Sequence, residues 1–477
     1  MIDFEIIERF RRRVKGCHHL ELHTATIQNF HLLTDLNSLR TLPKHRAFLG
    51  TLLTSIGIQF MTLISGVLVA RLLQPDGRGV FAAVQLWPVI FAALAWLGAN
   101  YSLAVRVAKE PKDILPLARL AVALAILSSG VFMAVAWVIL PWLLPPHQES
   151  ILQMSRLYLI IFLPINVLLA YLQALDQGAG RLGPFNTVRH VLSIVYVFII
   201  LGFWLADVHD VAWFAGALLT ANFFTLLVRI HLTSWSCLLP DFNPMRLASV
   251  IKQGAPYLAS SAVYLAKDNV ERLLLLFLLG TTQLGWYVIA FTAAGLHTTV
   301  TKSVNFLILS RSGALNSEYA ARDSARIFRI MSVVSAALSV TMMAILPLLI
   351  PIMFGMAFQQ AVMPAIVLVA AQYFSGQGAI IDEGLRAQSR PTIGLAAGLV
   401  SMAVFAGGAF WLAPAHGILG VAIASVGGQI TYCLFLAIYL RSRFQTQLLP
   451  SAVDLHFIRQ NLDNALTKVL RILPTRS

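Results

Sequence analysis

LLQPDGRGVFAAVQ, residues 72–85, and LLGTTQLGWYVIAF, residues 278–291, share one pattern. In each segment a Leu-Leu pair is followed by five residues, then a glycine (Gly79 or Gly285) and, two positions later, an aromatic residue (Phe81 or Tyr287). The offset between the two segments is 206 residues throughout. We interpret this pattern as an internal repeat, with a weaker echo between residues 172–184 and 385–391.

The sequence around these segments is strongly apolar. Of its 477 residues, 58% are hydrophobic and only 12% are charged, and the mean hydropathy is +0.76. About a quarter of the residues of a soluble domain are charged, so an ordinary soluble enzyme is excluded. Apolar runs of membrane-crossing length predict twelve transmembrane helices, near residues 47–73, 80–105, 117–140, 151–172, 189–206, 211–230, 254–279, 286–309, 328–350, 361–381, 392–413 and 417–440.

The repeat offset covers six of these spans, and six is an even number. Both halves would therefore cross the membrane in the same direction, as parallel repeats about an axis along the membrane normal. The predicted fold is an all-α polytopic membrane protein whose two pseudo-symmetric six-helix lobes enclose a central cavity, which is the architecture of a transporter. The expected organisation is a basic tail (1–46), an N-terminal lobe (47–232), a linker (233–253), a C-terminal lobe (254–440) and a tail with an amphipathic helix (441–477).

The net charge of +14 is explained by where the basic residues lie. If the N-terminus is cytoplasmic, 30 of the 35 Lys and Arg residues fall on the inner side, and only Arg71, Arg78 and Arg156 fall on the outer side. This asymmetry obeys the positive-inside rule and predicts an inner-membrane protein with both termini in the cytoplasm. No nucleic-acid partner is needed to explain the charge.

The seventh predicted span carries four charges at its middle: Lys267, Asp268, Glu271 and Arg272. Facing lipid, they would cost on the order of 10 kcal/mol, so they must face protein or water. Lys267 and Glu271 are four residues apart, as are Asp268 and Arg272, so each pair could form an ion pair along the helix surface and have only a structural role. Alternatively the charges line a hydrated cavity, where Lys267 and Arg272 would grip phosphate and Asp268 or Glu271 would hold a proton or release the cations.

Three further basic residues are candidates for the cavity. Arg71 and Arg156 lie near the outer ends of the first and fourth spans, where they either snorkel to the interface or line the outer mouth. Lys302, in the inner half of the eighth span, either snorkels inward or joins the cavity. The pattern indicates no metal site and no cofactor, although coupling to a proton or other ion gradient is compatible with it.

Both tails carry local signals. The N-terminal residues lack the early apolar core of a signal peptide, and residues 4–15 have the spacing of a basic interfacial helix. In the C-terminal tail, Ser451 and Asp454 are placed as in a capping box that opens a surface helix.

The sequence contains no GxxxxGK[ST] loop, and the predicted outer loops are short. The first observation argues against ATP hydrolysis by that machinery, and the second argues against a membrane glycan polymerase or ligase. Five motifs occur in order between about Phe48 and Leu440: VARLLQPDGRGVFAAVQLWPVIFAALAWLG (69–98), LLLLFLLGTTQLGWYVIAFT (273–292), PIMFGMAFQQAVMPAIVLVAAQYF (351–374), LRAQSRPTIG (385–394) and GILGVAIAS (417–425). Together they resemble the motifs of bacterial polysaccharide-biosynthesis flippases, members of the multidrug/oligosaccharidyl-lipid/polysaccharide exporter superfamily.

This resemblance implies that the protein moves undecaprenyl-pyrophosphate-linked oligosaccharide from the inner to the outer leaflet through a cationic cavity. Its partners would be the lipid-linked glycan, membrane lipids and, through contact, the polysaccharide polymerase machinery. Relatives that flip the peptidoglycan precursor usually have two more helices, which makes that substrate less fitting. The alternatives are a cation-coupled multidrug exporter of the same superfamily and, as a more distant case, a glycan polymerase or ligase.

Overall fold

The computed structural model describes residues 43–109, 114–144, 149–233, 239–298, 317–388 and 390–451, together with residues 454, 456, 459 and 460. The chain divides into two compact units, Met1–Gln59 and Phe60–Ser477. Of the first unit only residues 43–59 are described, and they are helical. The predicted interfacial helix at residues 4–15 lies outside the described residues.

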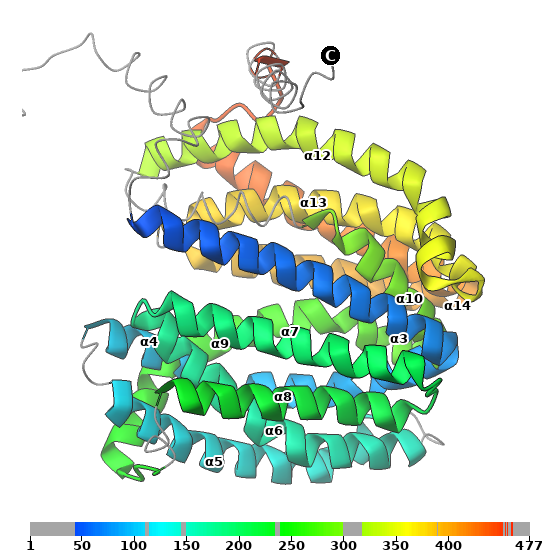
Figure 1. Ribbon diagram of the computed structural model, residues 1–477. Coiled ribbons are helices and arrows are strands. Elements are labelled where there is room, and N and C mark those ends of the chain that lie inside the picture. Colours follow the sequence, from blue (N-terminus) through cyan, green and yellow to red (C-terminus); the bar gives the residue numbers. More distant parts are fainter. Residues whose placement is uncertain are drawn as a thin grey trace, which may run out of the picture. The chain divides into compact units, whose positions relative to one another are not determined.

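Every regular element in the described ranges is helical (Figure 1). Two of these elements, η3 and η5, are short 3-10 helices that follow α5 and α12. The elements are α3 (Pro43–Ala95), α4 (Ala99–Lys109), α5 (Ile114–Ile139), η3 (Leu140–Trp142), α6 (Glu149–Gly178), α7 (Leu182–Leu205), α8 (Val211–Thr233), α9 (Pro244–Leu279), α10 (Thr281–Gly295), α12 (Ser317–Phe354), η5 (Met356–Ala361), α13 (Val362–Ala387) and α14 (Pro391–Phe444).

Among the described residues, eight helices are long and apolar enough to cross a membrane. Two of them contain a kink that separates two spans: α3 bends at Gln74 and α14 bends at Gly417. The helix α9, which carries charges at its middle, and the 15-residue α10 are not among these eight, so the number of twelve spans stays a prediction. The predicted all-α polytopic fold is confirmed.

The junctions between spans are tighter than predicted. Residues 75–79, expected to form a connection, belong to the second half of α3, because the chain turns at Gln74 alone (φ 56, ψ 178). Proline is well suited to the position after such a turn, since the first residue of a helix needs no donor, and Pro75 occupies it. The equivalent turn 206 residues later is at Gly280 (φ 84, ψ −174), and α10 begins at Thr281 rather than at residue 286.

The two halves repeat one packing scheme. In the N-terminal lobe α6 contacts α4, α5 and α8, and in the C-terminal lobe α13, six spans later, contacts α10, α12 and α14. Figure 1 shows α5, α6 and α8 side by side. In the N-terminal lobe the ring of Phe214 (α8) packs edge-on against Phe81 (α3) and Phe203 (α7), with ring centroids 6.4 and 5.4 Å apart. This arrangement is the two-lobe fold that the repeat predicts.

The lobes touch near both ends of the crossing helices. At the end where α3 and α9 turn, which we name the kink end, the Thr282 hydroxyl donates a hydrogen bond to the Asp76 carboxylate (2.5 Å). At the opposite end, which we name the terminal end because α14 finishes there, α4 packs on α9. There the rings of Tyr101 and Tyr257 stack with centroids 5.1 Å apart, and Ser102 bonds Gln253 (3.2 Å).

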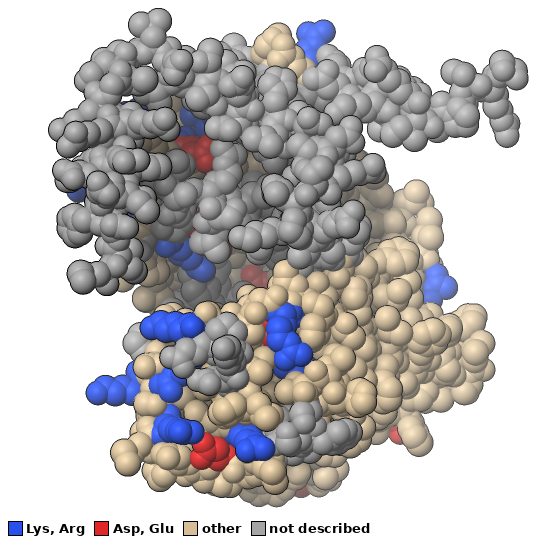
Figure 2. Space-filling view, turned by 60° about the vertical axis from the view of Figure 1, so that its left-hand side comes forward, with Lys and Arg blue, Asp and Glu red and all other residues tan. Residues whose placement is uncertain are grey.

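Charged side chains are distributed unevenly over the surface. Figure 2 shows a broad area without charge and basic side chains gathered on part of the face. Several helices carry basic residues in the turn that reaches the terminal end: Arg106 and Lys109 in α4, Arg386 in α13, and Arg441 and Arg443 in α14. Charge is thus concentrated where the chain would leave the bilayer.

Candidate functional site

Two arginines, one from each lobe, lie near the kink end. Arg272 lies in α9 about 12 Å along the helix from the Gly280 turn, and Arg78 lies in the first turn of the second half of α3. Their charges are close enough to interact, and Arg78 also interacts with Tyr196 of α7. Within the described residues, the buried Nε of Arg78 has no hydrogen-bond partner. We name this feature the Arg78–Arg272 pair.

Aromatic rings border both guanidinium groups. Arg272 lies 5.8 Å from the ring centroid of Phe291 in α10, and Arg78 lies 5.5 Å from that of Phe81. A cation over an aromatic face is stabilised without losing its charge or its donors. Two cations held this way attract an anion that fits between the lobes.

Glu271, next to Arg272, is bound within the C-terminal lobe. Its two carboxylate oxygens accept hydrogen bonds from Tyr287 of α10 and Ser425 of α14, each at 2.6 Å. Tyr287 is buried and Glu271 is half-buried. The carboxylate therefore joins three helices, which holds Arg272 on the same turn in place.

The other predicted residues of the seventh and eighth spans are outside this description. Lys267 and Asp268 lie in α9, but their side chains are not among those described, and Lys302 falls in the undescribed range 299–316. The predicted pairings of Lys267 with Glu271 and of Asp268 with Arg272 therefore stay predictions.

Arg71 and Arg156 make contacts away from the Arg78–Arg272 pair. Arg71, exposed near the kink end, donates to the backbone carbonyls of Ile352 (2.5 Å) and Met353 (2.8 Å). It thereby satisfies carbonyls in the last turn of α12 that lack a partner within the helix. Arg156 donates to the carbonyl of Trp137 (3.1 Å), and its guanidinium lies 4.5 Å from the centroid of that ring, which links α6 to α5. Whether either residue also meets substrate stays a prediction.

Sequence reasoning does not select Arg78 as a candidate for the cavity. It places Arg78 in a connection between spans, since Pro75, Gly77 and Gly79 around it are ordinary loop residues. The available signal was the repeat itself: the glycine at position 79 recurs at 285 inside an apolar helix.

The fold is shared with known membrane transporters. A multidrug resistance MATE family transporter of the MOP superfamily in its inward-facing conformation is similar with a TM-score of 0.66 and 15% identity, over 81% of this chain and 94% of that one. The lipid II flippase MurJ in an inward closed conformation is similar with a TM-score of 0.67 and 13% identity, over 83% and 87%. A MOP superfamily transporter from Pyrococcus furiosus has a TM-score of 0.59 at 16% identity, over 85% and 97%.

These similarities define the class of fold: that of the multidrug/oligosaccharidyl-lipid/polysaccharide exporters. No curated protein matches the sequence. Residues 68–363 match the family described as "Polysaccharide biosynthesis protein", and the chain belongs to this family. The resemblance drawn from the sequence is confirmed at that level.

Proposed function

We propose that the protein is a flippase that moves undecaprenyl-pyrophosphate-linked oligosaccharide across the bacterial inner membrane by alternating access, for surface polysaccharide synthesis. The protein is a transporter and not an enzyme. Both termini are cytoplasmic, so the terminal end faces the cytoplasm and the kink end faces outward. Its partners are the lipid-linked glycan and the surrounding lipids, with the polymerase machinery in contact on the outer side.

The observation that carries this proposal is the Arg78–Arg272 pair. Arginine binds phosphate oxygens through a planar fork of donors, and two arginines match the two phosphates of a pyrophosphate. One arginine comes from each lobe, so an anion bound by both neutralises their mutual repulsion and draws the lobes together. A bare pair of cations is a poor receptor for the cationic compounds that a cation-coupled drug exporter would take.

Movement between the two membrane faces requires the contacts at one end to break while those at the other hold. At the kink end Asp76 accepts a hydrogen bond from Thr282, and Gly79 packs against the backbone of Thr281. At the terminal end Ser102 and Arg106 donate to Gln253, and Tyr101 stacks on Tyr257. These contacts join separate helices, so the lobes can separate at either end without unfolding a helix.

The proposal is tested by deleting the gene and measuring both inner-membrane lipids and surface glycan. We expect undecaprenyl-pyrophosphate oligosaccharide to accumulate facing the cytoplasm while surface glycan falls, and the accumulated glycan identifies the substrate. Unchanged lipids and glycan together with increased drug sensitivity would favour the multidrug exporter instead. Complementation with the unaltered gene must restore both measurements.

A further inference from the structure

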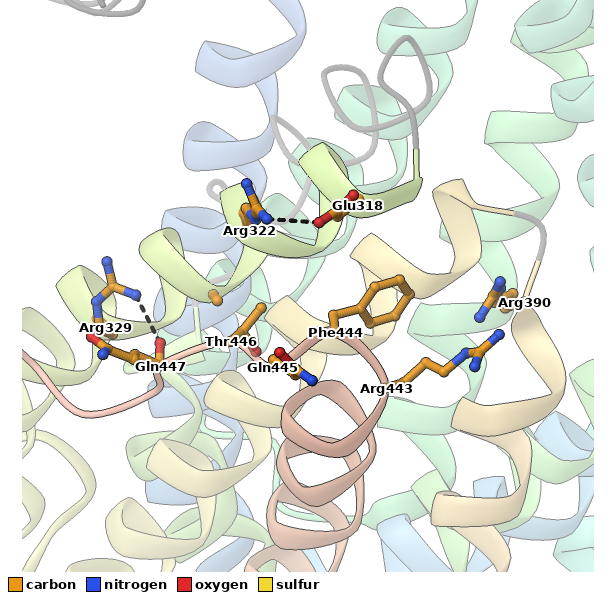
Figure 3. A pocket seen from close by; sticks show the side chains of 10 residues that line it. Glu318, Arg322, Arg329, Arg390, Arg443, Phe444, Gln445, Thr446 and Gln447 are labelled. Carbon is orange, nitrogen blue, oxygen red and sulfur yellow. Dashed lines mark hydrogen bonds and ion pairs between the residues drawn. The ribbon is translucent and has the colours of Figure 1, made fainter.

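Away from the Arg78–Arg272 pair, the terminal end of the C-terminal lobe contains a second concentration of arginine (Figure 3). A cavity of about 760 Å³ lies between the start of α12, the residue before α14 and the segment that follows α14. Arg322 and Arg329 line it from α12, and Arg390 and Arg443 line it from either end of α14. We name it the basic pocket.

Two of the four arginines are already paired. Arg322 forms an ion pair with Glu318 (2.6 Å), the one acidic residue in the pocket lining. Arg329 forms an ion pair with Asp454 (2.8 Å) and donates to the carbonyl of Gln447 (2.7 Å). The charges of Arg322 and Arg329 are therefore already neutralised, and these two residues contribute mainly to the wall of the pocket.

The other two, Arg390 and Arg443, have no carboxylate partner within the described part of the chain. Arg390 donates to the hydroxyl of Tyr439 (3.2 Å), and its guanidinium lies 5.6 Å from the ring centroid of Phe444. In Figure 3 the side chains of Arg390 and Arg443 extend toward each other. Two unneutralised guanidinium groups facing one space repel each other unless an anion lies between them.

The volume of the pocket exceeds the need of a simple ion and is in the range of small-molecule sites. A second cavity of about 820 Å³ shares Gln445, Thr446 and Gln447 with it. That second cavity is lined largely by apolar side chains, including Leu434, Ile438, Leu448 and Leu449. A phospholipid has a charged phosphate group and apolar acyl chains. The basic pocket is suited to the phosphate, and the adjoining apolar cavity is suited to the chains.

We propose that the basic pocket binds a phosphate group through Arg390 and Arg443. The adjoining apolar cavity favours a phosphate carried by an anionic membrane lipid over free phosphate. The site is separate from the Arg78–Arg272 pair of the proposed function, because its residues lie at the terminal end, on α12, directly before α14 and in the tail that α14 leads into. Binding there would stabilise the docking of residues 445–447 against α12.

The test uses full-length protein, purified in detergent and stripped of lipid, with binding followed by native mass spectrometry. Phosphatidylglycerol is the anionic probe, phosphatidylethanolamine the zwitterionic comparison and inorganic pyrophosphate the soluble competitor. The test variant is Arg390→Gln/Arg443→Gln. The matched control, Lys109→Gln/Lys252→Gln, removes the same charge from exposed positions that line neither the basic pocket nor the adjoining apolar cavity.

We expect phosphatidylglycerol to bind more tightly than phosphatidylethanolamine, and its affinity to fall about tenfold in the test variant. The control should stay within about twofold of the unaltered protein. Retained lipid binding in excess pyrophosphate identifies the lipid as the source of the phosphate, whereas displacement by bound pyrophosphate identifies soluble phosphate. Equal losses in both variants, or no loss in the test variant, would overturn the site. If the double variant does not fold, Arg443→Gln alone, at an exposed position, decides in its place.

Discussion

Gly79 and Gly285, 206 residues apart in the sequence, pack backbone against backbone at the kink end. A β-carbon on Gly79 would lie 1.8 Å from the carbonyl oxygen of Thr281, and one on Gly285 would lie 2.0 Å from that of Pro75. Thr281 is itself the repeat equivalent of Pro75, so the contact is reciprocal. The pseudo-twofold axis that relates the two lobes therefore passes between these two glycines. The repeated glycine of the sequence motif is thus a residue at which the two lobes contact each other.

Replacing Gly79 or Gly285 by alanine should open the kink end. The added methyl group meets backbone atoms, which cannot rotate away as a side chain could, and overpacking of this kind costs about 1–3 kcal/mol. We expect a lower melting temperature and faster labelling of a cysteine placed at Thr282 by a membrane-impermeant thiol reagent. Gly130→Ala is the control, since no atom lies within 4 Å of its added methyl group. Labelling of Gly79→Ala at the rate of this control would contradict the role of the contact.

The sequence predicted an all-α polytopic fold of two lobes, because hydropathy and repeat spacing can be read directly from the sequence. It did not predict how the halves meet. Asp176 and Asp382, also 206 residues apart, are both buried at helix ends, yet their partners differ. Asp176 pairs with Arg229, whereas Asp382 accepts from Tyr432 (3.0 Å) and Arg386 (2.8 Å). Because the partners of the two aspartates differ, the equivalence of Asp176 and Asp382 cannot be recognised from the sequence. Only the packing shows which distant residues neutralise each buried carboxylate.

Neutralising either member of the Arg78–Arg272 pair should abolish transport and leave the protein in the membrane. Each arginine supplies a charge that the other cannot replace, because they come from different lobes. We expect Arg78→Gln and Arg272→Gln each to lower surface glycan at least tenfold in the deletion strain, a loss equivalent to about 1.4 kcal/mol of substrate binding. Arg272→Lys keeps the charge without the planar fork and should be intermediate. Immunoblots of membrane fractions check expression.

Lys109→Gln, an exposed basic residue at the terminal end, is the matched control for these variants and should transport normally. Normal surface glycan in both Arg78→Gln and Arg272→Gln would rule out the pair as the phosphate site. Equal loss in the control would point instead to a general effect of positive charge on topology.

The ion pair between Asp176 and Arg229 should be the most costly polar contact to break in the N-terminal lobe. Both side chains are fully buried, the Nε and Oδ2 atoms are 2.7 Å apart, and Arg229 also donates to the carbonyl of Leu172 (3.0 Å). Arg229→Leu leaves a buried carboxylate without its main cation, which costs about 3–5 kcal/mol. The double variant Asp176→Asn/Arg229→Gln removes both charges and should recover much of the loss. Melting temperatures in detergent measure both effects, and a double variant no more stable than Arg229→Leu would contradict this account.

The contact between Asp454 and Arg329 should fasten the C-terminal segment in a pH-dependent way. Burial alone would raise the pKa of the Asp454 carboxyl, but hydrogen bonds from Arg329 (2.8 Å) and from the hydroxyl and backbone of Ser451 (2.7 and 2.9 Å) outweigh it and lower the pKa to about 2. Ser451 in turn accepts from the Asp454 amide (3.3 Å), which confirms the predicted capping pair. Because the folded-state pKa lies below the ordinary value of about 3.9, the stabilisation is fully present above about pH 4 and is lost as the pH falls toward 2.

A fluorophore on Gln460→Cys, in a background lacking Cys17, Cys237 and Cys433, reports this docking through its anisotropy. We expect constant, high anisotropy from neutral pH down to about pH 4 and a fall between about pH 4 and 2. Asp454→Asn should show low anisotropy already at pH 7, because an amide does not form the ion pair with Arg329. Glu318→Gln, which breaks an exposed pair worth little, should behave like the unaltered protein. A transition above pH 5, or identical profiles for Asp454→Asn and the unaltered protein, would show that another contact holds the segment.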